Sequence, residues 1–311
     1  YQRCAEDTLG EQQNSLKGLI GGGGSGVKMK DGTLVFPLEG TKTKDKTEED
    51  GKTVSLLIYS SDTESWKLSK GMSADGCSDP SVVEWEKDKL MMMTACDDGR
   101  RRVYEIGDKG DSWTEALGTL SRVWGSKQKG EAKVVGSGLI TMNLGDEDEQ
   151  KNVILVTLPV YSEEKENGEK GELHLWLTDN THIVDIGPVS GKDDDAAASA
   201  LLYKSGTDGN NKKEELIALY EKKGDGESSN SLWSVRLTEQ LQRVKEVLAT
   251  WKEVDKRVSE LCPSESAVQA RSTDSACKNT KITAGLVGFL SGNFSENTWR
   301  DEYLGVNATV K

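Results

Sequence analysis

The chain has 311 residues, a formal net charge of −13 and a charged fraction of 30%. This acidic excess argues against nucleic-acid binding and against adhesion to anionic membranes, because phosphate groups need Lys and Arg to neutralise them. Apolar runs stay well below the roughly 20 residues that span a bilayer. The length allows one large domain or two smaller ones.

The first 30 residues are polar and contain four consecutive glycines, Gly21–Gly24. A phosphate-binding loop would need Lys followed by Ser or Thr at the start of a helix, and neither follows. We therefore expect a flexible turn that leads into a strand. The chain shows no signal-peptide pattern and closes on strand-like sequence, so we expect both ends to be cut from a longer protein.

Residues 30–237 repeat a pattern of short apolar strands and tight polar turns rich in Gly, Asn and Asp. Trp66 and Trp113 close the first two units and are 47 residues apart, which is the period of a four-stranded propeller blade. Four such units leave a propeller open, so we expect part of a larger one. The expected strands lie at 34–38 and 54–59; 82–85, 90–96 and 101–105; 139–144, 153–160, 173–177 and 183–186; and 200–203, 215–220 and 232–237.

The period then changes to that of a helix. Apolar residues recur at helical spacing from Leu241 to Leu261, and Thr238 can cap the first turn. This predicts one amphipathic helix over 238–262 that ends before Pro263. A linker loop over 263–281 and the first strands of a second β domain over 282–311 follow.

Five cysteines leave the compartment open. Cys262 and Cys277 flank a Ser-rich and Ala-rich loop, which fits a loop-closing disulfide or two free thiols. Cys77 and Cys96 flank adjacent expected strands and could also pair.

Two sequons begin at Asn293 and Asn307 and fit N-glycosylation in a secreted context. His174 alternates with apolar neighbours on an expected strand, so we expect it at the surface. The acidic runs at 146–149 and 193–195 are interpreted as solvated loops. The sequence therefore predicts no metal and no cofactor.

The turn Asp108-x-Gly110-x-Ser112-Trp113 resembles the Asp box of sialidases, and the stretch from Ser60 to Trp66 is a poorer copy without the glycine. In such a turn the Asp side chain ties down the backbone, Gly takes a positive φ and Trp packs between blades. The motif indicates fold rather than activity.

Four further stretches, 76–80, 118–125, 175–180 and 285–291, resemble the trypanosomal trans-sialidase superfamily. The resemblance covers the chain from about residue 20. It implies a mainly β fold: an incomplete six-bladed β-propeller of sialidase type over 1–237, the long α-helix over 238–262, and the first strands of a lectin-like β-sandwich over 282–311.

The same resemblance implies a site. Active members bind the sialic acid carboxylate with three arginines and use a tyrosine nucleophile activated by a glutamate. Glu84 matches this glutamate, and Arg100, or alternatively Arg101, matches the second arginine. Without the resemblance, Glu84 is a polar strand residue and the arginines form a solvated strand edge.

Other positions depart from the pattern. Lys170 stands where the third arginine is expected, and lysine lacks the bidentate fork of arginine. Ala198 stands at the nucleophile, while Tyr203 is interpreted as a core tyrosine of the strand. The first arginine and the catalytic aspartate would precede residue 1.

These features predict a sialidase-fold glycoprotein without turnover, at the cell surface or secreted, that acts in adhesion. Its expected partners are sialylated glycans or host surface and matrix proteins, with no nucleic acid, and with a membrane only through an anchor outside this chain. The alternative is an active exo-α-sialidase or trans-sialidase that cleaves or transfers sialic acid by a retaining mechanism.

Overall fold

The computed structural model describes most of the chain, with gaps between the parts. The described residues are 16–42, 51–116, 120, 135–144, 151–161, 170–208, 211–224, 230–261, 290–295, 297–301 and 308–309.

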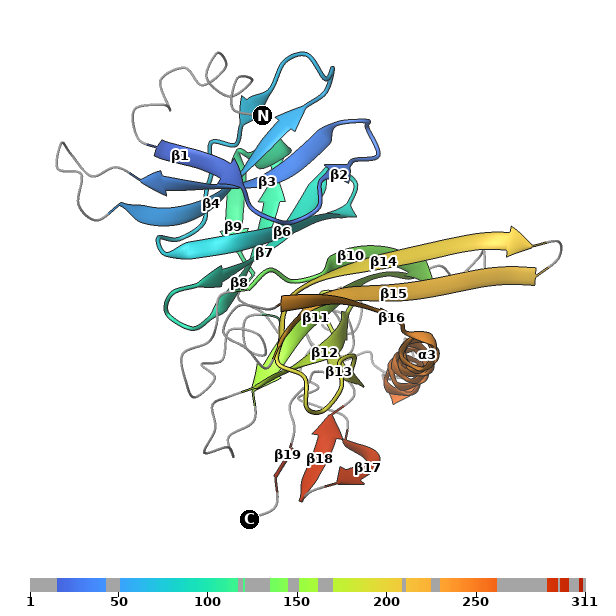
Figure 1. Ribbon diagram of the computed structural model, residues 1–311. Coiled ribbons are helices and arrows are strands. Elements are labelled where there is room, and N and C mark those ends of the chain that lie inside the picture. The colour runs from blue at the N-terminus through green and yellow to red at the C-terminus, as the bar shows by residue number, and fades with distance from the viewer. Residues whose placement is uncertain are drawn as a thin grey trace, which may run out of the picture.

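The described strands form five antiparallel sheets, four of which follow one another along the chain before the helix (Figure 1). The first sheet contains β1 (Leu16–Gly21), β2 (Val27–Lys28), β3 (Leu34–Lys42), β4 (Lys52–Ser60) and β5 (Lys67–Leu68). The second contains β6 (Cys77–Glu86), β7 (Lys89–Cys96), β8 (Arg101–Gly107) and β9 (Ser112–Glu115). The third contains β10 (Leu139–Leu144), β11 (Lys151–Tyr161), β12 (Gly171–Thr178) and β13 (Ile183–Pro188).

The fourth sheet has three strands, β14 (Ala196–Asp208), β15 (Asn211–Lys223) and β16 (Asn230–Arg236). These four sheets are the four units that the sequence predicts, and they form a propeller-like arrangement of four blades. A fifth sheet after the helix contains β17 (Leu290–Ser295), β18 (Thr298–Asp301) and β19 (Ala308–Thr309). Its lectin-like nature and a total of six blades stay predictions.

The blades are held together by apolar layers between successive sheets. Strand β7 shows how, because its alternate side chains point to opposite faces. Leu90 and Met92 pack into a core with the first blade, whereas Met91 and Met93 pack into a core with the third. A strand buried on both faces reads as one continuous apolar run, which is why residues 90–96 lack polar alternation.

The helix α3 (Thr238–Leu261) packs on the third and fourth blades, as its periodicity predicts. Val244, Val247 and Trp251 are fully buried, and their spacing of three and four residues places them on one face. In the part of the chain that the structure describes, no helix is long and apolar enough to cross a membrane.

The two Asp-box copies are built differently. In the better copy, Asp108, Lys109 and Gly110 all have positive φ, and the Trp113 indole donates to Gly110 O at 2.9 Å. A Cβ on Gly110 would lie 2.6 Å from Ser69 Cβ, so a larger residue would not fit.

In the poorer copy the carboxylate itself holds the turn. Asp62 accepts from the backbone N–H groups of Ser65 at 2.7 Å and Glu64 at 2.9 Å. These bonds lower the pKa of Asp62 to about 2. The side-chain tie expected of an Asp box is therefore found at Asp62.

The possible pairing of Cys77 with Cys96 is confirmed. Cys77 and Cys96 form a disulfide between directly opposite residues of β6 and β7.

The expectation that His174 lies at the surface is wrong, because its side chain is only 12% exposed and contacts Asp185 at 2.8 Å. Burial lowers the pKa of His174, but Asp185 and Glu172 outweigh burial and raise it overall. The contacts with Asp185 and Glu172 compensate for the partial burial of the His174 imidazole.

The glycine run is a packed turn between β1 and β2. Gly22 donates its N–H to Pro37 O at 3.2 Å, and a Cβ on Gly22 would lie 2.5 Å from Pro80 Cγ. The first blade thus approaches the start of β6 through bare backbone. The predicted turn is confirmed. The close approach of the Gly22 backbone to Pro80 explains why this position has no side chain.

Candidate functional site

The first strands of successive blades lie beside one another. Strand β6 contacts β3, β4 and β10, and β10 contacts β14. The segment 135–138, which enters β10, therefore lies between β6 and β14. Residues from all four blades, most of them polar, lie around it. We call this group the inner cluster: Glu39, Asp79, Arg101, Ser137, Tyr161, Ala198 and Ser199.

Hydrogen bonds fix the middle of the inner cluster. Ser81 Oγ donates to Ser137 O at 2.7 Å, which joins the second blade to the segment before β10. The Ser199 N–H donates to Gly136 O at 3.1 Å, and Ser199 Oγ lies 2.9 Å from Thr157 Oγ1. These bonds make the site a preformed surface on rigid strands.

Two carboxyl groups from neighbouring blades meet at one edge. The Asp79 N–H donates to Glu39 Oε1 at 2.7 Å, and Ser78 Oγ donates to Asp79 Oδ2 at 2.9 Å. Burial raises the pKa of Glu39, the Asp79 N–H opposes this, and the nearby Asp79 charge raises the pKa further. Asp79 has a φ of 51°, a left-handed conformation that Asp tolerates better than most residues.

Arg101 supplies the positive charge. Its Nη1 donates to Ser137 Oγ at 3.0 Å and to Val135 O at 3.3 Å. Burial lowers the pKa of Arg101, while the Tyr161 and Asp79 charges act to raise it. Arg101 stands at the start of β8, opposite Ala95 of β7.

Arg100 lies outside the inner cluster. The Arg100 residue is exposed, and its backbone N–H donates to Asp98 at 3.2 Å. Of the two arginines that the sequence offers for carboxylate binding, Arg101 is the one that lies in the inner cluster. The favoured choice of Arg100 does not fit this geometry, because its side chain lies before the strand and points into solvent.

Ala198 and Asp79 face each other across Gly136. Ala198 Cβ and Asp79 Oδ1 each lie 4.0 Å from the position that a Cβ would occupy on Gly136. A methyl group cannot attack an anomeric carbon, so position 198 brings no nucleophile to this surface.

Glu84 lies elsewhere. It is five residues beyond Asp79 on β6, about 16 Å at the usual rise of a strand. Its Oε2 accepts from the Lys30 N–H at 3.0 Å, and no described residue hydrogen-bonds its buried Oε1. The carboxylate beside Ala198 is therefore Asp79, and this geometry does not support the predicted pairing of Glu84 with position 198. The sequence feature that could have pointed to Asp79 is its position between Ser78 and Pro80, at the start of β6.

The remaining predicted positions divide between described and undescribed residues. Lys170 is exposed, and its Nζ donates to Asp193 O at 3.1 Å. Tyr203 packs against the core of the last two blades and donates to Glu214 at 2.8 Å. The Cys262–Cys277 disulfide and Asn307 lie outside the described residues, and Asn293 lies within β17. Within the described ranges, no group of three or more His, Cys, Asp or Glu residues could hold a metal ion.

Comparisons with known proteins agree with this architecture. A family model described as a BNR repeat-like domain matches residues 2–221, and one described as the trans-sialidase C-terminal domain matches residues 282–311. The chain is 37% identical over 312 residues to sialidase 85-1.1 of Trypanosoma cruzi, covering 98% of this chain and 36% of that protein.

Solved structures give the same result. Trypanosoma rangeli sialidase matches with a TM-score of 0.71 at 34% identity, covering 95% of this chain and 43% of the other. The same sialidase in complex with sialic acid matches with a TM-score of 0.68 at 32% identity, covering 95% and 42%. Four successive antiparallel blades followed by a helix are thus a sialidase-type arrangement.

The chain belongs to the BNR repeat-like family and is a trypanosomal trans-sialidase-like protein with the sialidase fold. It spans between a third and a half of the length of these relatives.

Proposed function

We propose that this protein binds the terminal sialic acid of glycans at the inner cluster without cleaving it. Arg101 would pair with the sugar carboxylate, since a guanidinium matches a carboxylate with two parallel hydrogen bonds. The observation that carries the proposal is Ala198, a methyl group opposite the Asp79 carboxylate. A site that has Arg101 but no nucleophile at position 198 favours binding over turnover.

The relatives support the choice of ligand. One solved T. rangeli sialidase structure of 32% identity is a complex with sialic acid. The cell surface or the secreted fraction is the location we propose, with adhesion to sialylated glycans or host surface proteins as the outcome. An anchor to a membrane would come from sequence outside this chain.

An active sialidase is the second candidate, and Tyr161 is the observation that favours it. A Cβ on Gly171 would lie 3.1 Å from Tyr161 Cε1 and 3.0 Å from Ala196 O, so this ring lies near the start of the strand that carries Ala198. A phenolic oxygen in the inner cluster could take the role that Ala198 cannot. Under this candidate, Tyr161→Phe would abolish turnover.

The test uses the full-length protein with 3′-sialyllactose and a fluorogenic sialoside. We expect saturable binding of sialyllactose in calorimetry and no release of fluorophore. Arg101→Ala should weaken binding by about 10-fold or more, because hydrogen bonds to charged groups contribute about 1.5–3 kcal/mol. Arg100→Ala is the matched control and should leave affinity within about twofold.

Two results would overturn the proposal. Turnover of the sialoside that Tyr161→Phe removes would establish the second candidate. Equal loss of binding in Arg100→Ala and Arg101→Ala would place the carboxylate contact outside the inner cluster.

A further inference from the structure

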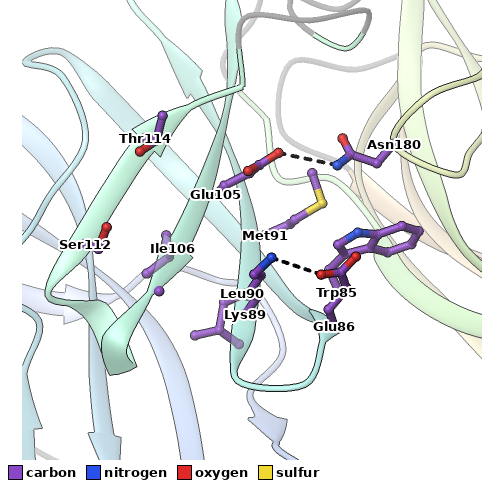
Figure 2. A pocket seen from close by; sticks show the side chains of 11 residues that line it. Trp85, Glu86, Lys89, Leu90, Met91, Glu105, Ile106, Ser112, Thr114 and Asn180 are labelled. Atoms are coloured by element: carbon purple, nitrogen blue, oxygen red, sulfur yellow. Dashed lines mark hydrogen bonds and ion pairs between the residues drawn. The ribbon is translucent and has the colours of Figure 1, made fainter. Parts of the chain in front are cut away.

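A pocket of about 220 Å³ lies at the far end of the second blade, where the turn after β12 reaches across from the third blade (Figure 2). Arg101 and Glu105 are four residues apart on β8, about 13 Å at the usual rise of a strand, so this pocket is well separated from the inner cluster. We propose that it binds one neutral hexose of an oligosaccharide. This inference stands independently of the proposed function.

The pocket has an apolar side suited to the face of a sugar ring. Trp85 and Met91 line it, above Leu90 and Ile106, which are each 1% exposed. Figure 2 shows the Met91 side chain between Glu105 and the Trp85 ring. Trp85 is the partly exposed member of this apolar side, and an aromatic ring provides a large, rigid apolar contact for the C–H groups of a pyranose.

Opposite this side lie polar groups with both donors and acceptors. Asn180 Nδ2 donates to Glu105 Oε1 at 3.3 Å, so both planar groups are already aligned. The hydroxyl groups of Ser112 and Thr114 line the same pocket from β9. Such a set can serve the paired hydroxyls of a sugar, each of which both donates and accepts.

The walls are fixed before any ligand arrives. Trp85 O accepts from Asn152 Nδ2 of the third blade at 2.5 Å. The Asn180 N–H donates to Thr178 Oγ1 at 3.0 Å, which holds the turn that carries the amide. A preformed site avoids the ordering cost that weakens small-ligand binding.

The charges disfavour an anionic ligand. Glu86 and Glu105 both line the pocket and would repel an anion such as sialic acid. Lys89 lies 3.0 Å from Glu86 and offsets the charge of that carboxylate, so a neutral sugar meets little net charge. The volume is below the roughly 300–1,000 Å³ of pockets for drug-sized ligands, so it fits one small ring.

The experiment measures saturation-transfer NMR and titrations with methyl β-galactoside and methyl β-glucoside on the full-length protein. Free N-acetylneuraminic acid and choline serve as the anionic and cationic probes. We expect at least one neutral glycoside to bind with a Kd on the order of 1 mM. Trp85→Ala and Glu105→Ala should each weaken it by about 10-fold.

Two matched controls are available in the first blade, at residues that do not line the pocket. Trp66→Ala removes a tryptophan that packs on Phe36, and Glu64→Ala removes an exposed glutamate. Both should leave glycoside binding unchanged. Glu105 is itself exposed, so Glu105→Ala keeps the proposal testable even if Trp85→Ala fails to fold.

Three results would overturn the proposal. One is binding of choline or N-acetylneuraminic acid alone at this pocket. A second is neutral glycoside binding that Glu105→Ala does not reduce. A third is the absence of any glycoside signal from folded protein at tens of millimolar.

Discussion

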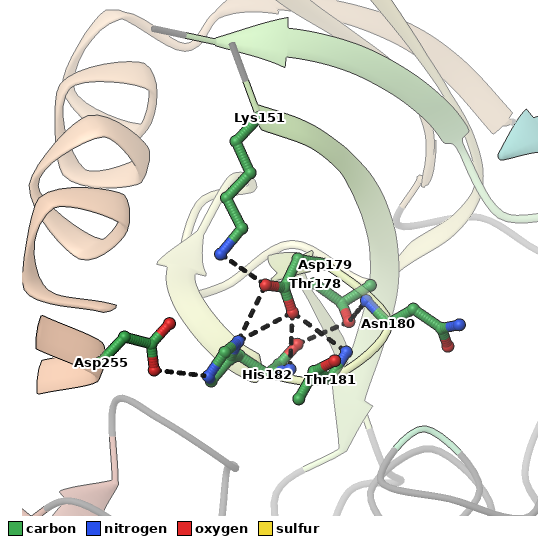
Figure 3. A network of polar contacts seen from close by, with 7 residues as sticks. All are labelled: Lys151, Thr178, Asp179, Asn180, Thr181, His182 and Asp255. Atoms are coloured by element: carbon green, nitrogen blue, oxygen red, sulfur yellow. Dashed lines mark hydrogen bonds and ion pairs between the residues drawn. The ribbon is translucent and has the colours of Figure 1, made fainter. Parts of the chain in front are cut away.

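Two clusters of polar residues, the inner cluster and a second one beside α3, differ in how their charges are paired. In the inner cluster, Glu39 and Asp79 are two neighbouring carboxyl groups, and Arg101 is bonded to neutral oxygen atoms. The second group, which we call the helix clamp, comprises Lys151, Asp179, His182 and Asp255, which Figure 3 shows, together with Trp251 of α3. Its charged groups bond to one another.

The helix clamp joins the third blade to α3. Asp179 Oδ2 lies 2.6 Å from Lys151 Nζ and 2.8 Å from His182 Nδ1. The His182 ring stacks on Trp251 at 4.8 Å, and Lys151 Nζ lies 5.3 Å from the centre of the same indole. Mutual pairing makes the helix clamp a stabilising element, whereas the described contacts pair none of the inner-cluster charges of opposite sign with each other.

The largest effect should come from Trp251, which is fully buried between helix and blade. Trp251→Ala should lower the free energy of unfolding by about 3–5 kcal/mol, through lost burial and the cavity left behind. Urea unfolding followed by circular dichroism measures this. The control is Trp233→Ala, because Trp233 is 48% exposed and should cost less than about 1 kcal/mol. Equal costs for both would mean that α3 does not rely on the clamp.

A smaller and pH-dependent effect should come from Asp179. Burial raises its pKa, but His182 and Lys151 outweigh burial, so the pKa in the folded state lies below the ordinary value. A lowered carboxyl pKa stabilises the fold above the unfolded pKa of about 3.9, and this stabilisation is lost as the pH falls below it.

Asp179→Asn should therefore cost about 2–3 kcal/mol at pH 7, since it breaks a buried pair while keeping the size of the side chain. The difference from the unsubstituted protein should shrink as the pH falls below about 4. Urea midpoints measured at several pH values test this. A cost that stays constant down to pH 3 would contradict the role of the Asp179 charge.

The sequence predicted the fold better than the site. The four blades follow from strand length, turn composition and the Trp66–Trp113 spacing, all of which are local signals. The helix follows from apolar periodicity alone. The clamp could not be predicted, because His182 and Trp251 lie 69 residues apart and their contact depends on how α3 packs.

The inner cluster was only partly predictable for the same reason. The family resemblance places Ala198 at the nucleophile position and Glu84 at the activating glutamate, whereas the structure places Asp79 near Ala198. Both acids lie on one strand, and only the packing of neighbouring blades shows which end of β6 lies beside Gly136 and hence near β14. The contacts of Arg101 with Val135 and Ser137 also join segments more than 30 residues apart, a relation without a local signal.

The smallest effect concerns a single titration in the inner cluster. Burial raises the pKa of Glu39, and the Asp79 charge adds to this. Asp79→Asn removes the charge and keeps the backbone N–H that donates to Glu39, so the pKa of Glu39 should fall. Carbon-detected NMR titration of the glutamate carboxyl groups measures it, with Glu64 as an exposed reference. An unchanged or raised pKa would show that the two carboxyl groups do not interact.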